Sequence, residues 1–175
     1  PAILELAQLA KAQGICLTVD AEEADRLELS LDLIAAVHAD PSLDGYQGFG
    51  LAVQAYQKRA PFVIDWLAEQ AKKTGRRFCV RLVKGAYWDS EIKRAQEGGH
   101  AGYPVYTRKP NTDVSYLACA KRLFEHGPAA FYPAFATHNA HTIAAIHHVA
   151  KGRPFEFQRL HGMGADLYDE VIGEK

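Results

Sequence analysis

The sequence predicts an α/β protein that forms an incomplete portion of a (β/α)8 TIM-type barrel, with about five strand–helix units. The first observation is a pattern that occurs four times: an amphipathic run, then glycine, then a short apolar run. The second is that these apolar runs are nearly continuous, as in parallel strands covered on both faces. The third is the absence of Gly-x-Gly-x-x-Gly and P-loop motifs, which weakens an open nucleotide-binding sheet.

The pattern divides the chain into alternating helices and strands. Apolar residues spaced by three and four positions predict helices over residues 3–13, 62–74, 114–126 and 142–151. A glycine follows each helix, where it accommodates the left-handed conformation that ends a helix. The predicted strands are residues 15–19, 78–83, 130–136 and 155–157, with a fifth at 50–56 after a helix over 27–37.

Alternating helices and buried strands indicate parallel βαβ units, and we favour a barrel over an open doubly wound sheet. A complete barrel needs ~250 residues, whereas this chain has 175 and begins with Pro1 rather than methionine. We therefore expect residues 1–175 to be the central part of a barrel within a longer polypeptide. The edges of such a partial sheet would be open.

Composition argues against several classes of protein. A formal net charge of −1 provides no overall attraction to nucleic acid or to an anionic membrane. The chain has neither the features of a signal peptide at its start nor the ~20-residue apolar run needed to cross a bilayer. Its three cysteines are widely spaced, without Cys/His zinc spacing. A reduced, cytoplasmic protein is the expectation.

Polar side chains follow every predicted strand, at the end where barrel enzymes place their active sites. Arg81 is the most informative, because a cation within an apolar strand is costly unless an anion meets it. A ligand phosphate would accept a forked contact from its guanidinium. The alternative is an internal salt bridge to a carboxylate such as Asp20.

Lys84, just beyond the same strand, has three interpretations. Its ammonium could bind phosphate, form a Schiff base as in barrel aldolases, or pair with Asp89. Residues 85–88 then place Gly and Ala beside Tyr and Trp, which would let a flat ring approach the backbone. Ordinary core aromatics at a barrel rim explain that pattern equally well.

The link over residues 103–113 contains adjacent cations, Arg108 and Lys109, before a helix that we expect Asn111 or Thr112 to cap. This segment could hold phosphate or ribose, or it could be a solvated loop. Residues 137–141 open a further helix, whose free N–H groups favour an anion or a polar ligand edge. We expect no metal at the histidines near the strand ends, because no His-x-His follows the first strand.

Four segments, in this order, resemble the proline dehydrogenase family. They are Arg81-Leu82-Val83-Lys84-Gly85-Ala86-Tyr87-Trp88-Asp89, Tyr103-Pro104-Val105-Tyr106-Thr107-Arg108-Lys109, Phe135-Ala136-Thr137-His138-Asn139 and Phe155-Glu156-Phe157-Gln158-Arg159-Leu160-His161-Gly162-Met163-Gly164. The link lengths resemble those of the bacterial bifunctional proline utilization A proteins. The resemblance implies a barrel that binds FAD at its strand ends and oxidises L-proline to Δ1-pyrroline-5-carboxylate. In that family hydride passes to flavin N5, and the electrons then reach a membrane quinone.

The resemblance also implies a role for each matching residue. The residues expected to contact the flavin are Gln54, Arg81, Val83 and Gln158. Those expected to line the cofactor are Lys84, Gly85, Ala86, Tyr87 and Trp88. The ribose-phosphate region falls to Thr107, Arg108 and Lys109, and the adenosine side to Thr137, His138 and Asn139. The proline pocket falls to Asp20 and Leu160, with Tyr87 also facing the substrate.

The chain departs from the family pattern at both ends. It begins at about the third barrel strand and stops soon after the seventh. It therefore lacks the Arg-Arg pair that holds the proline carboxylate, an earlier pocket Lys, and the DNA-binding and aldehyde dehydrogenase domains of the bifunctional proteins. We expect this segment to bind no nucleic acid and to be inactive alone, with the remainder of the parent polypeptide as its partner. Peripheral association of the parent with the inner membrane is left open.

Two other classes of function remain as alternatives. One is an aldolase-like barrel that forms a Schiff base through Lys84. The other is a non-catalytic scaffold that associates through its open sheet edges. Flavin absorbance, borohydride trapping and gel filtration distinguish these from an FAD-dependent enzyme.

Overall fold

The computed structural model describes residues 2–173, in which five parallel strands form one sheet. The strands are β1 (Leu17–Val19), β2 (Phe49–Gln54), β3 (Phe78–Val83), β4 (Phe131–Ala136) and β5 (Glu156–Gln158). Each pairs with the next along the chain, in the order β1-β2-β3-β4-β5. A doubly wound sheet reverses its strand order at a switch point, and this order does not reverse. The predicted five-unit portion of a barrel is confirmed.

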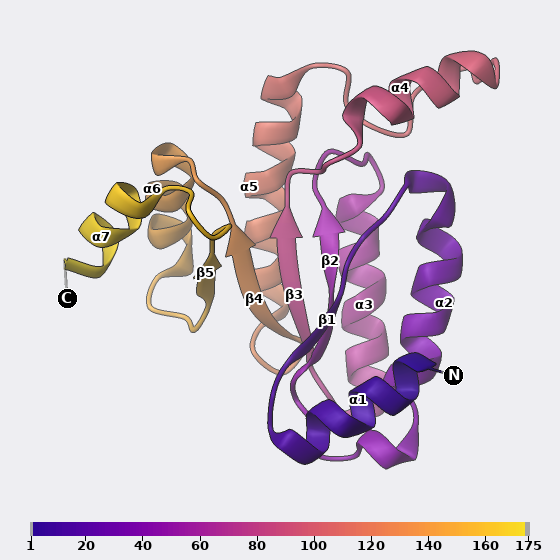
Figure 1. Cartoon of the computed structure of the whole chain (residues 1–175), viewed down its shortest axis with the longest axis vertical. Coiled ribbons are helices and arrows are strands. Elements are labelled where there is room, and N and C mark those ends of the chain that lie inside the picture. The colour runs from indigo at the N-terminus through magenta and orange to yellow at the C-terminus, as the bar shows by residue number, and fades with distance from the viewer. Residues whose placement is uncertain (1, 174–175) are drawn as a thin grey trace.

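Helices alternate with the strands. Within residues 2–173 they are α1 (Ala2–Gln13), α2 (Leu27–His38), α3 (Ala60–Thr74), α4 (Trp88–Glu97), α5 (Lys109–His126), α6 (Ala140–Ala150) and α7 (Ala165–Gly173), with short 3-10 turns at Ala24–Arg26 and Pro41–Leu43. In Figure 1, α3 and α5 lie behind the sheet, and α4 lies beyond the carboxyl ends of the strands. None of the described helices combines the length and the apolar character needed to span a membrane.

The core lies between the sheet and these helices. Phe78, Val80 and Leu82 alternate along β3 and are fully buried. They pack in one cluster with Leu67 of α3 and Leu123 of α5. Burial of such a side chain contributes about 1.5–3 kcal/mol. The intervening β3 positions face the opposite side of the sheet, as the period of a strand requires.

Two helices differ from the sequence prediction. Helix α5 begins at Lys109, so the predicted cap at Asn111 or Thr112 is wrong, and both residues lie inside the helix. Pro110 occupies the first turn, where its missing N–H costs nothing. Helix α4 is absent from the prediction, because it is short and strongly polar and has only a few apolar residues to mark its buried face. It is held through Glu91, a buried carboxylate that accepts the Ala24 N–H at 2.6 Å.

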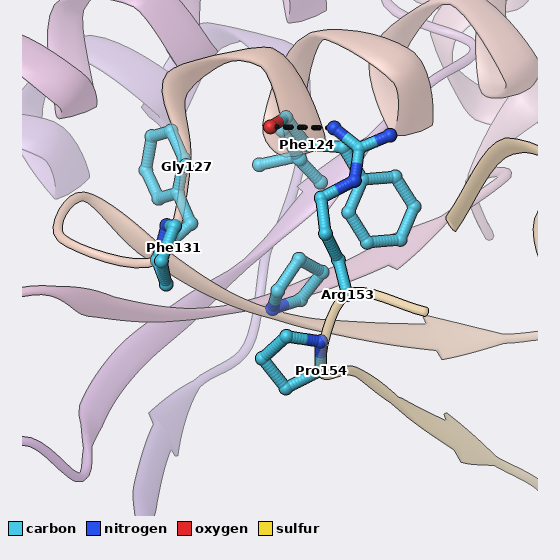
Figure 2. A pocket seen from close by; sticks show the side chains of 8 residues that line it. Phe124, Gly127, Phe131, Arg153 and Pro154 are labelled. Atoms are coloured by element: carbon cyan, nitrogen blue, oxygen red, sulfur yellow. Dashed lines mark hydrogen bonds between the residues drawn. The ribbon is translucent and has the colours of Figure 1, made fainter. Parts of the chain in front are cut away.

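The ends of α5 and α6 are joined by one guanidinium. Arg153 donates to the carbonyl oxygens of Val149 at 2.7 Å, Ala150 at 2.9 Å and Phe124 at 3.0 Å. Figure 2 shows the last of these bonds, with the Arg153 side chain beside the Phe124 ring. Because the last carbonyls of a helix have no partner within it, this arginine caps both helices at the amino-terminal end of the sheet.

Candidate active site

A cavity of about 900 Å³ lies at the carboxyl ends of the strands. Most of the residues assigned to the site from the sequence line it: Asp20, Gln54, Arg81, Val83, Lys84, Gly85, Ala86, Tyr87, Thr137, His138, Asn139, Gln158 and Leu160. All five strand exits therefore contribute to one space, as barrel topology requires. The residues that line it but were not assigned to the site from the sequence are Ala21, Glu22, Ala52, Ala136 and Arg159. Ala52 could have been found, because it lies two residues before Gln54 and shares its face of the strand.

Arg81 joins three strands across this cavity. Its Nη1 donates to Asp20 Oδ1, just after β1, and its Nε donates to Gln158 Oε1 on β5 at 2.8 Å. The salt bridge to Asp20 that was one of two interpretations of Arg81 is thus present. Asp20 is 72% exposed while the Arg81 side chain is 29% exposed, so the carboxylate lies on the solvent side of the pair. The guanidinium still lines the cavity.

Gln54 fixes the exit of β2 to its neighbours. This buried side chain donates from Nε2 to the Glu22 carbonyl at 2.8 Å and accepts the Ala86 N–H at 3.4 Å. The same Glu22 accepts a hydrogen bond from the Tyr87 hydroxyl at 3.0 Å, and this bond raises the pKa of Tyr87 above its ordinary value. The segments after β1, β2 and β3 are therefore held together by side chains at the cavity wall.

Lys84 and Lys109 share one carboxylate. Asp113 accepts from Lys84 Nζ at 2.5 Å and from Lys109 Nζ at 2.6 Å. The bonds to Lys109 and Lys84 hold the pKa of Asp113 below its usual range. Of the three interpretations of Lys84, the ion pair is thus present, but its partner is Asp113 rather than Asp89, which lies in the first turn of α4.

A second cavity of about 410 Å³ adjoins the first. Lys84 and Gly85 line both, and the second is completed by Tyr56, Trp88, Thr107, Lys109 and Thr112. Trp88, Thr107 and Lys109 thus lie in this side chamber rather than in the main cavity. Arg108 lines neither cavity and is the exposed residue that precedes α5. Trp88 begins α4 and donates from Nε1 to the Tyr106 carbonyl at 2.9 Å.

The exit of β4 is organised by the start of α6. Asn139 caps this helix, because its Oδ1 accepts the Thr142 N–H at 2.9 Å. His138 Nε2 accepts the Leu160 N–H at 3.0 Å, which ties the exits of β4 and β5 together. Tyr168 of α7 donates to the Thr137 carbonyl at 2.8 Å, a support that no feature of the sequence pattern indicates. Across residues 2–173, no three His, Cys, Asp or Glu side chains gather as metal ligands would.

A sequence model of the family described as proline dehydrogenase matches residues 2–175. The chain belongs to the proline dehydrogenase family. Relatives in this family include the bifunctional protein PutA of Salmonella typhimurium, 57% identical over 99% of this chain, and that of Rhizobium meliloti, 55% identical over 99%. A bovine hydroxyproline dehydrogenase is 36% identical over 64% of the chain and 24% of its own length. The chain spans only 13% and 14% of the two bacterial relatives.

Solved structures of the family share this fold. Proline utilization A (PutA) from Bradyrhizobium japonicum superimposes with a TM-score of 0.96 at 60% identity, covering 98% of this chain and 18% of the other. PutA from Bdellovibrio bacteriovorus, inactivated by N-propargylglycine, gives a TM-score of 0.90 at 35% identity, covering 95% and 18%. The five-stranded sheet is therefore similar to part of the proline dehydrogenase barrel in PutA.

Proposed function

We propose that residues 1–175 form the central, FAD-binding part of a proline dehydrogenase barrel. The reaction is the oxidation of L-proline to Δ1-pyrroline-5-carboxylate, with a quinone as electron acceptor. The observation that carries the proposal is the cavity itself, where Arg81 is held by Asp20 and Gln158 at the meeting point of the five strand exits. The family membership of the chain supports the substrate, and the cavity supports the cofactor.

The chemistry of the lining fits FAD. The main cavity and the side chamber share Lys84 and Gly85 in their linings, with Arg81 in the first and Lys109 in the second. A pyrophosphate requires cations, and two ammonium groups around one carboxylate provide a net positive charge. Ala86 adds only a methyl group to the lining of the main cavity, which leaves room beside the backbone for a flat ring. When bound, the flavin would accept the hydride of the substrate.

Each group of residues then has a task. Arg81, Gln54, Val83 and Gln158 orient the flavin, and Lys84, Gly85, Ala86, Tyr87 and Trp88 line it. Thr107, Arg108 and Lys109 hold the ribose-phosphate region, and Thr137, His138 and Asn139 hold the adenosine side. Asp20, Tyr87 and Leu160 belong to the proline pocket. The Schiff-base alternative is disfavoured, because Lys84 is ion-paired with Asp113 and that chemistry needs a neutral amine.

The proposal extends to the surroundings of the segment. Its partner is the remainder of a longer polypeptide with an aldehyde dehydrogenase domain, acting in the cytoplasm and meeting quinone at the inner membrane. The bifunctional PutA relatives, of which the chain covers a small part, support this arrangement. The 175 residues alone would bind flavin but turn over little proline, because the Arg-Arg pair expected to hold the proline carboxylate lies outside them. Such a clamp contributes ~1.5–3 kcal/mol of substrate binding per charged hydrogen bond.

The test is to incubate the purified chain with FAD, desalt it, and record its visible absorbance and its proline-dependent reduction of a dye. We expect retained flavin absorbance with little turnover. A chain that retains no flavin would count against the proposed cofactor site. Robust turnover would refute the proposed inactivity of the segment. Borohydride trapping of a carbonyl compound on Lys84 would support the aldolase-like alternative.

A further inference from the structure

Tyr56 lies just after β2 and is 2% exposed. Its N–H donates to the Lys84 carbonyl at 2.7 Å, and its own carbonyl accepts the Tyr106 N–H at 2.8 Å. The next residue, Gln57, forms an antiparallel bridge with Val105. The backbone at Tyr56 therefore joins the exit of β3 to the link before α5, two segments that are distant in the chain.

The ring of Tyr56 fills the space beside Gly85. A Cβ atom at residue 85 would lie 2.4 Å from ring atoms of Tyr56, and Gly85 has φ of 134°, a conformation that only glycine adopts readily. The ring thus sets the path of the chain directly after Lys84. The Tyr56 hydroxyl is buried and has no hydrogen-bond partner among residues 2–173, and burial raises its pKa to about 12. The ring, rather than the hydroxyl, makes the packing contact.

The two segments joined by Tyr56 each supply a wall of the side chamber. Lys84 and Gly85 belong to the segment after β3, and Thr107 and Lys109 belong to the segment that follows Tyr106. Trp88 is a further link between these two segments, since its Nε1 donates to the Tyr106 carbonyl. A shift of the Tyr56 ring would therefore move Lys84 relative to Lys109 and disturb the bonds that both lysines form with Asp113.

We propose that Tyr56 is a positioning residue that aligns the two walls of the side chamber for the phosphates of a dinucleotide. The inference rests on the proposed flavin function and goes beyond it, by assigning phosphate alignment to the ring of a residue that need not touch the phosphates. Such pre-alignment favours binding because the ordering of two segments and two lysine side chains is completed before the ligand arrives.

The experiment compares FAD with riboflavin, which carries the same ring system without phosphates. Dissociation constants are measured by quenching of flavin fluorescence on the apoprotein of the 175-residue chain, for the unmodified chain, Tyr56→Leu and Tyr56→Phe. Tyr46→Leu is the matched control, because Tyr46 is also buried but lies before β2, with its hydroxyl bonded to the Ile15 carbonyl at 2.7 Å. Thermal unfolding of each apoprotein is recorded alongside.

For Tyr56→Leu we expect FAD binding to weaken about tenfold more than riboflavin binding, as when a charged hydrogen bond is lost. Tyr56→Phe should leave both constants unchanged, and Tyr46→Leu should lower the unfolding temperature without changing their ratio. If Tyr56→Leu does not fold, Tyr56→Met removes the same ring, fills more of its space, and should change the ratio in the same way. An unchanged ratio in a folded variant would overturn the inference. Failure of the unmodified chain to bind either flavin would instead refute the proposed function.

Discussion

Arg81 and Gln158 are 77 residues apart in the chain, yet Arg81 Nε donates a hydrogen bond of 2.8 Å to Gln158 Oε1. The same guanidinium is paired with Asp20 through Nη1. One side chain on β3 therefore connects the exits of β1 and β5, the two edge strands of the sheet. This connection depends on the planar fork of arginine, which directs its donors in fixed directions.

Arg81→Lys should consequently weaken FAD binding about tenfold or more while changing the unfolding temperature little. The ammonium of lysine is a point charge and cannot maintain both contacts in fixed geometry. Flavin fluorescence quenching measures the affinity. The matched control is Arg122→Lys, which disrupts the paired bonds from Arg122 to Asp65 between α5 and α3. Equal FAD affinity in Arg81→Lys and the unmodified chain would show that the fork is not needed.

The strands were the most predictable part of the molecule. β3 was predicted at 78–83, the residues it occupies, because an apolar run interrupted only by Arg81 lies between Arg77 and Lys84 and leaves few alternatives. Strand order and parallel pairing followed from the alternation with helices. The positions of the cavity residues followed in turn, since parallel strands bring their carboxyl ends to one edge.

The partners of the site residues were less predictable. Asp113 is separated from Lys84 by a helix and a long link, and no local spacing indicates that they meet. The support of Tyr168 for Thr137 and the anchoring of α4 through Glu91 are likewise long-range contacts. Periodicity reports which face of an element is buried, but it carries no information about which distant side chain reaches that face.

Asn139 has two possible tasks that a pair of substitutions separates. Its Oδ1 caps α6, and its resemblance-based role is to hold the adenosine side of FAD. Asn139→Asp keeps the capping oxygen, so stability should stay close to that of the unmodified chain, whereas Asn139→Ala should cost about 1 kcal/mol. If the amide also donates to the cofactor, both variants should bind FAD more weakly. Full FAD affinity in Asn139→Asp would leave the residue with capping alone.

His38 should make stability fall at acid pH. It is 2% exposed and stacks on Phe78 with ring centroids 3.7 Å apart. Burial lowers its pKa from 6.5 to about 4, opposed by a hydrogen bond to the Arg77 carbonyl and assisted by the Arg76 cation. Because the folded pKa lies below the unfolded one, the neutral ring favours folding above pH 6.5. This stabilisation is lost as the pH falls toward 4, and amounts to about 3 kcal/mol.

The measurement is the free energy of unfolding in urea at several pH values across this window, for the unmodified chain and His38→Gln. Other groups titrate in the same range, so the informative quantity is the difference between the two proteins. That difference should shrink as the pH falls, because only the unmodified chain must protonate or expel a buried imidazole. A difference that stays constant from neutral pH to about pH 4 would exclude His38 as the source.

Arg153 should contribute more to stability than any exposed ion pair, because its guanidinium donates to the last carbonyls of two helices and lies 4.8 Å from the Phe124 ring centroid (Figure 2). Arg153→Ala should lower the free energy of unfolding by about 2–3 kcal/mol. The control is Lys121→Ala, whose pair with Glu125 on α5 is solvent-exposed and should contribute ~1 kcal/mol or less. Chemical denaturation measures the free energy of unfolding of both variants, provided that its dependence on denaturant concentration is unchanged. Equal losses of unfolding free energy in the two variants would contradict a capping role for Arg153.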